Sequence, residues 1–336
     1  VFVLDRDRNI LESVGADTAG YYTVEPPGPG EYILYTQRLG YFENETPLIA
    51  VEAGGVYGID FELRPEPFRL DPLAGDVVRA NPTFGPAVSA VLSAQLMLGA
   101  TDKAEILIKR MRDAEPLGQH WIGYELIAAR QRGEDVASAT TDLIGLYELP
   151  VPDGFDSLDA FNVAFAKVLG RLHGGKQQPL GQSLRGGTQT QRNLATFDDP
   201  VVQAYLKALR IPVSEHLERL GSSSANPCSA RNTGSFAIND CWSVTLNAQG
   251  FHESHVHPEG WLSSAYYVTV AKGKDREGWL KFGEAPIALP QQQDVLKWVE
   301  PQPGMLALFP SYLWHGTQPV TAGGERLTAP FDVVPV

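Results

Sequence analysis

The sequence predicts an α+β protein of several domains: a small N-terminal β-sandwich, a helical middle and a C-terminal barrel of the jelly-roll type. The chain has 336 residues, and single hydrophobic cores stop growing near ~250–300 residues. Polar–apolar alternation marks its start, helical periodicity its middle, and short strands between Gly/Pro turns its end. We therefore expect a sandwich over 1–66, a linker over 67–82, helices over 83–150, and a barrel with supporting helices over 151–336.

The first 66 residues contain short segments that alternate polar and apolar side chains. These segments predict antiparallel strands at 1–4, 21–24, 31–35 and 58–63. Turn formers such as Pro26-Pro27-Gly28-Pro29-Gly30 separate them. The recurring Gly-Tyr order, Gly20-Tyr21-Tyr22, Gly30-Glu31-Tyr32 and Gly40-Tyr41, resembles the carboxypeptidase regulatory-like β-sandwich. That resemblance implies a structural or adhesive module.

Helical periodicity begins after the proline-rich segment. The side chains expected on one helical face are Val88, Val91, Leu92, Met97 and Leu98, and Ile106, Leu107 and Met111 continue the pattern after a turn at 99–102. Gly99, Ala104 and Pro116 resemble the turn, packing alanine and terminal proline of a tetratricopeptide repeat, with a second copy over 117–148. The hairpin either forms a peptide-binding groove or packs beside the barrel.

Two further helices are expected to support the barrel. An apolar stripe predicts a helix over 157–173, and an N-cap followed by proline, Asp199-Pro200, predicts another that runs toward Pro212. Between them, the paired glycines of segment 184–190 indicate either a tight turn or a close backbone approach to a ligand. Arg185 is the candidate ligand contact in this segment.

Three of the seven histidines fall within residues 251–259. Residues i and i+2 of a strand point to the same face, so His255 and His257 can aim two imidazoles into the mouth of a barrel. The predicted strands 261–270, 279–282 and 303–310 form that barrel and lead to His315. Three protein ligands on one face leave open positions on an octahedral metal ion, as oxygenase chemistry requires.

A candidate anchor for an acidic ligand follows the last histidine. The guanidinium of Arg326 can grip a carboxylate through two hydrogen bonds. Thr328 lies two residues on, hence on the same face of a strand, and Tyr267 can complete the same subsite.

Residues 255–336 resemble the prolyl-hydroxylase-like 2-oxoglutarate/iron(II) oxygenases. The matching pieces are His255-x-His257, 262–268, 278–282, Pro303-Gly304, 309–311, His315 and 326–328. An oxygenase group in which tetratricopeptide-like helices precede this domain is similar over about 155–336, through segments 183–190, 255–258 and 313–317. The resemblance implies a double-stranded β-helix (jelly roll, cupin-like) with Fe(II), 2-oxoglutarate and O₂. It further implies His255, His257 and His315 as metal ligands, and Arg326, Thr328 and Tyr267 around 2-oxoglutarate.

The expected activity is hydroxylation of a C–H bond in a protein, peptide or small-molecule substrate, with release of succinate and CO₂. Two alternatives stay open: a three-histidine, cupin-like metal protein that does not use 2-oxoglutarate, and a non-catalytic interaction protein. The wider superfamily has His-x-Asp or His-x-Glu where this chain has His-x-His. A frame of His257-x-Glu259 with His315 would restore the carboxylate. We expect His252 on the opposite strand face from His255.

Charge and cysteine content limit the partners and the compartment. With 27 basic against 40 acidic residues, the net charge of −13 disfavours nucleic acid and anionic membrane as partners. Cys228 and Cys241 either pair or are small buried residues. Reduced iron and 2-oxoglutarate favour the cytoplasm. Export is the alternative, if a removed signal peptide preceded the sandwich.

Overall fold

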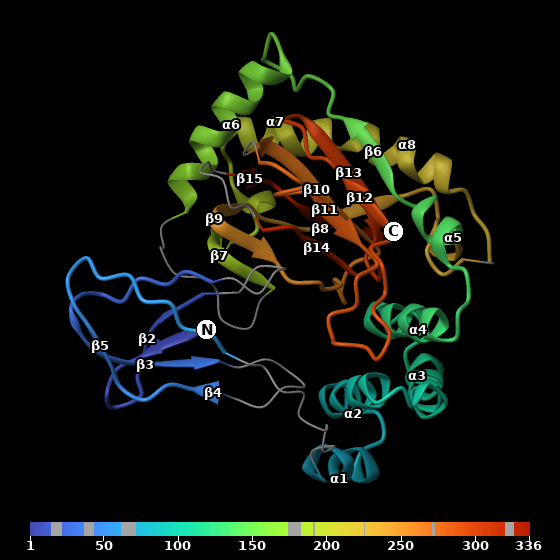
Figure 1. Cartoon of the computed structure of the whole chain (residues 1–336). Coiled ribbons are helices and arrows are strands. Elements are labelled where there is room, and N and C mark those ends of the chain that lie inside the picture. Colours follow the sequence, from blue (N-terminus) through green and yellow to red (C-terminus); the bar gives the residue numbers. More distant parts are fainter. Residues whose placement is uncertain are drawn as a thin grey trace. The chain divides into compact units, whose positions relative to one another are not determined.

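The computed structural model describes residues 1–14, 22–36, 44–61, 72–173, 183–190, 192–224, 226–270, 273–319 and 326–336 (Figure 1). The chain divides into two compact units, Val1–Ala104 with Ile287–Gln292 and Glu105–Pro286 with Gln293–Val336. Helices and antiparallel sheets occur together, as predicted. The predicted domain boundaries stay predictions. No helix in the described part of the chain is long and apolar enough to cross a membrane.

The first unit contains a five-stranded antiparallel sheet. Its strands are β1 (Phe2–Leu4), β2 (Ile10–Ser13), β3 (Gly30–Thr36), β4 (Asn44–Glu45) and β5 (Ile49–Val51). Their order is β2-β1-β3-β4, and β5 pairs with β3. Two of the predicted strands, at 1–4 and 31–35, are confirmed.

The other two strands predicted in this unit are absent from its described residues. Residues 22–24 and 58–61 have no strand pairing, while 21, 62 and 63 lie outside the described residues. A side chain joins these segments instead of a backbone ladder: the hydroxyl of Tyr22 donates to the carbonyl of Ile59 at 2.6 Å. The Gly40-Tyr41 pair also lies outside the described residues.

The expected linker contains a helix, α1 (Pro72–Ala80). Proline suits the first helical position because its missing amide hydrogen would have no partner there. Helix α1 packs against α2 (Gly85–Met97), where Val88, Val91 and Leu92 are buried as predicted. Leu98, expected on the same face, is exposed.

Helix α3 (Thr101–Ala114) follows the predicted turn, with Leu107 and Met111 buried and Ile106 exposed. The next helices are α4 (Gln119–Gln131) and α5 (Ala137–Thr141). The predicted second helical repeat does not reach 148, because β6 (Gly145–Glu148) is a strand paired with β13. Pairing of β6 satisfies backbone groups that the edge of β13 would otherwise expose, a tertiary effect that helical periodicity does not register.

The second unit also contains two antiparallel sheets. The larger has the order β6-β13-β10-β15-β9-β7, and β16 pairs with both β10 and β8. Its members beyond β6 are β7 (Leu184–Gln189), β8 (Phe236–Cys241), β9 (Val244–His252), β10 (Leu262–Thr269), β13 (Met305–Pro310), β15 (Arg326–Thr328) and β16 (Phe331–Pro335). The smaller sheet contains β11 (Leu280–Phe282), β12 (Lys297–Val299) and β14 (His315–Thr317). Strands β10, β11 and β13 confirm the three predicted ones. Closure as a jelly roll stays a prediction.

Helices α6 (Leu158–Leu172), α7 (Pro200–Ala208) and α8 (Arg210–Leu220) cover one face of the larger sheet (Figure 1). Both predicted helix starts are confirmed. The Ser157 hydroxyl accepts a hydrogen bond from the amide of Ala160 at the start of α6, and the Asp199 carboxylate accepts one from the amide of Val201 at the start of α7. Pro212 lies within the first turn of α8, where proline is tolerated. The face opposite these helices is left for the cavity described below.

The paired glycines form no turn but a bulged strand, β7, next to β9. Gly186 has a φ of +63°, and a Cβ on Gly187 would lie 2.3 Å from the carbonyl oxygen of Thr245. The close approach predicted from the glycines is therefore to another strand.

Gly187→Ala is expected to destabilise the protein by about 1–3 kcal/mol, because the β7–β9 ladder must move to admit the methyl group. The matched control is Gly170→Ala on the exposed face of α6, where no atom lies within 4 Å of the added carbon. That control should be neutral or stabilising by up to about 1 kcal/mol. Urea unfolding monitored by circular dichroism measures both variants. Equal effects would show that the contact with Thr245 does not constrain the bulge.

Candidate metal centre

Backbone hydrogen bonds bring the distant histidines together. The amide of His255 donates to the carbonyl of His315 at 2.9 Å, and the amide of His315 donates back at 3.0 Å, forming an isolated β-bridge. The amide of His257 donates to the carbonyl of Ser311 at 3.0 Å. The segment predicted to be a strand is thus a single bridge, because the amide of His257 bonds to Ser311 and that of Leu313 bonds to Pro310, so the next pair of the ladder does not form.

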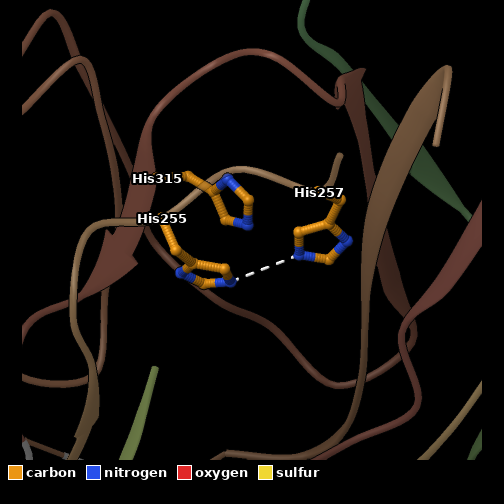
Figure 2. A group of neighbouring side chains, drawn as sticks. All are labelled: His255, His257 and His315. Atoms are coloured by element: carbon orange, nitrogen blue, oxygen red, sulfur yellow. Dashed lines mark hydrogen bonds between the residues drawn. The ribbon is translucent and has the colours of Figure 1, made fainter. Parts of the chain in front are cut away.

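The three imidazoles face one another around a common point (Figure 2). Ring centroids of His255 and His315 are 4.3 Å apart, and each lies 5.1 Å from the ring of His257. Their nearest ligand atoms all lie within 4.8 Å of one another. The structure therefore brings together the three residues that the sequence predicted as ligands.

Each imidazole is oriented by an acceptor at Nδ1. In His255 and His315 this atom lies 2.8 and 2.9 Å from the main-chain oxygen two residues earlier. In His257 it lies 2.8 and 2.9 Å from the two carboxylate oxygens of Asp332. For His255 and His315 the acceptors are carbonyl oxygens, which carry no hydrogen, so their neutral rings hold the proton on Nδ1 and the lone pair on Nε2.

Burial keeps the rings of His255 and His315 neutral. It lowers the pKa of His255 to about 3, with the neighbouring His257 adding to the shift. Burial likewise holds the pKa of His315 well below its usual range, and His255 and His257 add to the effect. Neutral imidazole is the form that binds a metal ion.

The distances between the rings fit a divalent cation. The Nε2 atoms of His255 and His257 are 3.2 Å apart, at hydrogen-bond distance (Figure 2). Two nitrogens at right angles on an ion, each at ~2.1 Å, would be about 3.0 Å apart. A divalent cation between the two rings would therefore take the place of this contact with little movement of either ring.

The imidazoles open into a cavity of about 50 Å³ between the two sheets. Its lining residues are Trp242, His252, His255, His257, Ser264, Ala265, Leu280, Phe309, His315, Gly316, Thr317, Arg326, Thr328 and Pro330. Although the chain has a net charge of −13, none of these described lining residues is acidic. The cavity therefore favours an anionic ligand.

Arg326 is the cationic side chain of this cavity and is 3% exposed. Its guanidinium lies 5.0 Å from the centroid of the Tyr267 ring, and no carboxylate of the described residues pairs with it. Its Nε and the hydroxyl of Tyr267 are buried without a hydrogen-bond partner in the described structure. A buried guanidinium without a counter-ion is costly, so these atoms fit the carboxylate of a small anion, with Thr328 beside them.

The structure separates the alternatives that the sequence left open around the ligands. Glu259 is exposed in the turn after Pro258 and does not belong to the histidine cluster. His252 lines the same cavity as His255, with ring centroids 5.6 Å apart, so its predicted placement on the opposite face was wrong. The reason is that the chain bends between them: β9 ends at His252, and the bridge begins only at His255.

Two other predicted positions have structural partners. Arg185 pairs with Glu253 at 2.6 Å, and the carbonyl of that same Glu253 orients His255. Arg185 is therefore close to the histidines but does not line the cavity. Cys228 and Cys241 are both buried and free, so the disulfide alternative was wrong.

Asp332 is the residue of this site that the sequence analysis missed. It is 8% exposed and lies in β16 behind His257. A signal was present in the sequence, since Asp332 is the single acidic residue of segment 326–336 and has apolar neighbours. A lone carboxylate in a buried strand needs a hydrogen-bond donor, but sequence alone does not identify that donor.

Residues 240–332 match the family model described as "Putative 2OG-Fe(II) oxygenase". The matched segment contains the three histidines, Arg326 and Asp332. The search of curated proteins found no match.

Solved structures with some likeness include a Pseudomonas putida prolyl-4-hydroxylase, at 18% identity and a TM-score of 0.39 over 60% of this chain and 99% of that one. A Trichoplax adhaerens prolyl hydroxylase in complex with a hypoxia-inducible-factor peptide has 16% identity and a TM-score of 0.40, over 61% and 91%. Streptomyces hygroscopicus HygX, with nickel and 2-oxoglutarate bound, has 13% identity and a TM-score of 0.37, over 57% and 83%. At these TM-scores and identities the structural likenesses support no conclusion about this protein. Of the comparisons, only the family match is used below.

The depressed pKa values predict how the stability of the metal-free protein changes with pH. From about pH 6.5 down toward 3, the unfolded chain takes up protons that folded His255 does not accept. The free energy of unfolding therefore falls with decreasing pH, by up to about 1.4 kcal/mol per pH unit for this group. Above about pH 7 both states hold the neutral ring and the dependence vanishes.

Urea unfolding in the presence of a chelator, from about pH 8 to 4, measures this dependence. Below about pH 6.5, the free energy of unfolding of His255→Gln should fall less steeply with decreasing pH than that of the wild type. Above about pH 7 the two curves should run parallel. Parallel curves over the whole range would contradict a depressed pKa for His255.

Proposed function

We propose that this protein is a dioxygenase that uses Fe(II), 2-oxoglutarate and O₂ to hydroxylate a C–H bond of a peptide or small-molecule substrate. The match of residues 240–332 to the 2OG-Fe(II) oxygenase family model supports this proposal. The observation that carries it is one cavity that holds both three converging imidazoles and a buried arginine without a counter-ion. The first suits the metal, and the second suits the distal carboxylate of 2-oxoglutarate.

In the proposed reaction, Fe(II) and 2-oxoglutarate supply the oxidation by O₂, so that one oxygen atom enters the substrate hydroxyl and the other enters succinate as CO₂ leaves. His255, His257 and His315 hold the ion from one side and leave its other positions open. The guanidinium of Arg326 binds the distal carboxylate through paired hydrogen bonds. The hydroxyls of Tyr267 and Thr328 donate to the same carboxylate.

The surroundings of His315 keep water away from the metal. Its ring centroid lies 4.6 Å from that of Phe309 and 6.3 Å from that of Phe282, and the side chain of Leu280 lines the cavity. Apolar walls exclude water that would compete for the open positions and strengthen the charge interactions within the cavity.

The alternatives are less consistent with this site. A three-histidine protein that does not use 2-oxoglutarate would leave Arg326 buried without an anion. A non-catalytic interaction protein would gain nothing from holding three imidazoles around one point. Neither alternative accounts for the ring neutrality and the unpaired guanidinium together.

His315→Ala is expected to abolish metal-dependent release of succinate and to weaken Fe(II) binding by at least about 10- to 100-fold, since it removes one of three ligands. Glu259→Gln is the matched control, because Glu259 belongs to the alternative ligand set and is exposed. It should keep both properties. Succinate formation and anaerobic Fe(II) titration are the measurements. Loss of metal binding in Glu259→Gln, with retention in His255→Ala, would establish the alternative set.

Arg326→Ala is expected to weaken 2-oxoglutarate binding by roughly 100-fold, since breaking a buried charge pair costs about 3 kcal/mol. Metal affinity should change by less than about twofold. The 2-oxoglutarate affinity of Arg326→Lys should lie between those of the wild type and Arg326→Ala, because an ammonium group keeps the charge but cannot form the paired hydrogen bonds. Anaerobic calorimetric titrations with metal and then with 2-oxoglutarate separate the two steps. An equal loss of both affinities would contradict the anchor role.

A further inference from the structure

A buried carboxylate lies behind the second of the three imidazoles. Both oxygens of Asp332 are within 2.9 Å of Nδ1 of His257, on the side of the ring opposite the Nε2 atom that faces His255. In the described structure, the carboxylate has no other hydrogen-bond or ion-pair partner. A buried carboxylate with a single hydrogen-bond donor is costly unless a cation lies nearby.

The backbone explains why His257 alone needs a side-chain acceptor. His255 and His315 each use the carbonyl two residues earlier. The carbonyl two residues before His257 belongs to His255, and it already accepts the amide of His315 in the bridge. The contact that joins the two ends of the site thus occupies the acceptor that His257 would otherwise use.

Strand pairing holds the carboxylate in place from both sides. In β16, Asp332 lies opposite Ser263 of β10 and Asp240 of β8, next to a bulge. Gly260 packs beside it, since a Cβ there would lie 3.4 Å from Asp332 Cγ, an ordinary van der Waals contact. A carboxylate fixed in this way can select one ring tautomer and one ring orientation.

The charge of the site gives Asp332 a second role. Three neutral imidazoles bring no negative charge to a divalent ion, and none of the described cavity-lining residues is acidic. A carboxylate hydrogen-bonded to the far nitrogen of a ligating imidazole makes that ring a stronger donor. It also places a negative charge one ring away from the ion.

We propose that Asp332 is a positioning residue that holds His257 as the Nδ1–H tautomer and supplies, from behind the imidazole, the negative charge that the three-histidine ligand set lacks. The claim about metal affinity rests on the proposed function. The claim about the tautomer does not, because the hydrogen bond is present without a metal.

The first measurement is the tautomer of His257 in the metal-free protein near pH 8, by long-range ¹H–¹⁵N correlation spectra. Its signals are assigned by their loss in His257→Gln. The wild type should carry the proton on Nδ1. In Asp332→Asn the amide can donate to Nδ1 instead, which moves the proton to Nε2 and blocks the ligand atom. A proton on Nε2 in the wild type would overturn the proposal without the need for any variant.

The second measurement is Mn(II) affinity by calorimetric titration without 2-oxoglutarate. Asp332→Asn should bind roughly 10- to 100-fold more weakly than the wild type. Asp240→Asn, on the paired strand and exposed, is the matched control and should bind like the wild type. Circular dichroism checks that both variants fold.

The outcomes separate the two proposals. An unchanged tautomer together with wild-type affinity in Asp332→Asn would overturn the role of Asp332. A wild type with its proton on Nδ1 but no affinity for Mn(II) or Fe(II) would refute the proposed function and still support Asp332 as the residue that orients His257.

Discussion

The reciprocal backbone hydrogen bonds between His255 and His315 are the contact on which the candidate site depends. They join two segments far apart in the chain and set the closest pair of imidazoles, with centroids 4.3 Å apart. They also occupy the carbonyl of His255. The imidazole of His257 therefore uses the carboxylate of Asp332, in β16, as its hydrogen-bond acceptor. One backbone contact thereby determines both where the ligand atoms lie and why a carboxylate stands behind one of them.

Burial decides the chemistry of the groups that this contact assembles. It lowers the pKa values of His255 and His315, which leaves their rings neutral with lone pairs toward the common point. It also makes the unpaired guanidinium of Arg326 unfavourable until an anion binds. In the proposed complex, the positive charges of a divalent ion and of the Arg326 guanidinium balance the negative charges of a dianionic cosubstrate and of the Asp332 carboxylate. The charges cancel in a cavity that has little water to screen them.

Several elements were predictable because their causes are local in sequence. The apolar stripe and Ser157 cap of α6, and the Asp199-Pro200 start of α7, follow from side chains within one or two helical turns. Strands β10, β11 and β13 follow from apolar runs between Gly/Pro turns. The failures have non-local causes: β6 is a strand because β13 offers an unpaired edge, and β7 is bulged because β9 lies against Gly187.

For the site, the sequence by itself determined the residue types and their spacing: two histidines at i and i+2, a third histidine downstream, and an arginine with a threonine on a closing strand. Those choices are enough to indicate a facial metal site beside a carboxylate anchor. Only the tertiary structure decided that Glu259 faces solvent, that His252 shares the cavity, and that Asp332 stands behind His257. The physical reason is that hydrogen bonds between distant backbone segments fix these positions. The periodicity of one segment does not indicate which other segment it will pair with.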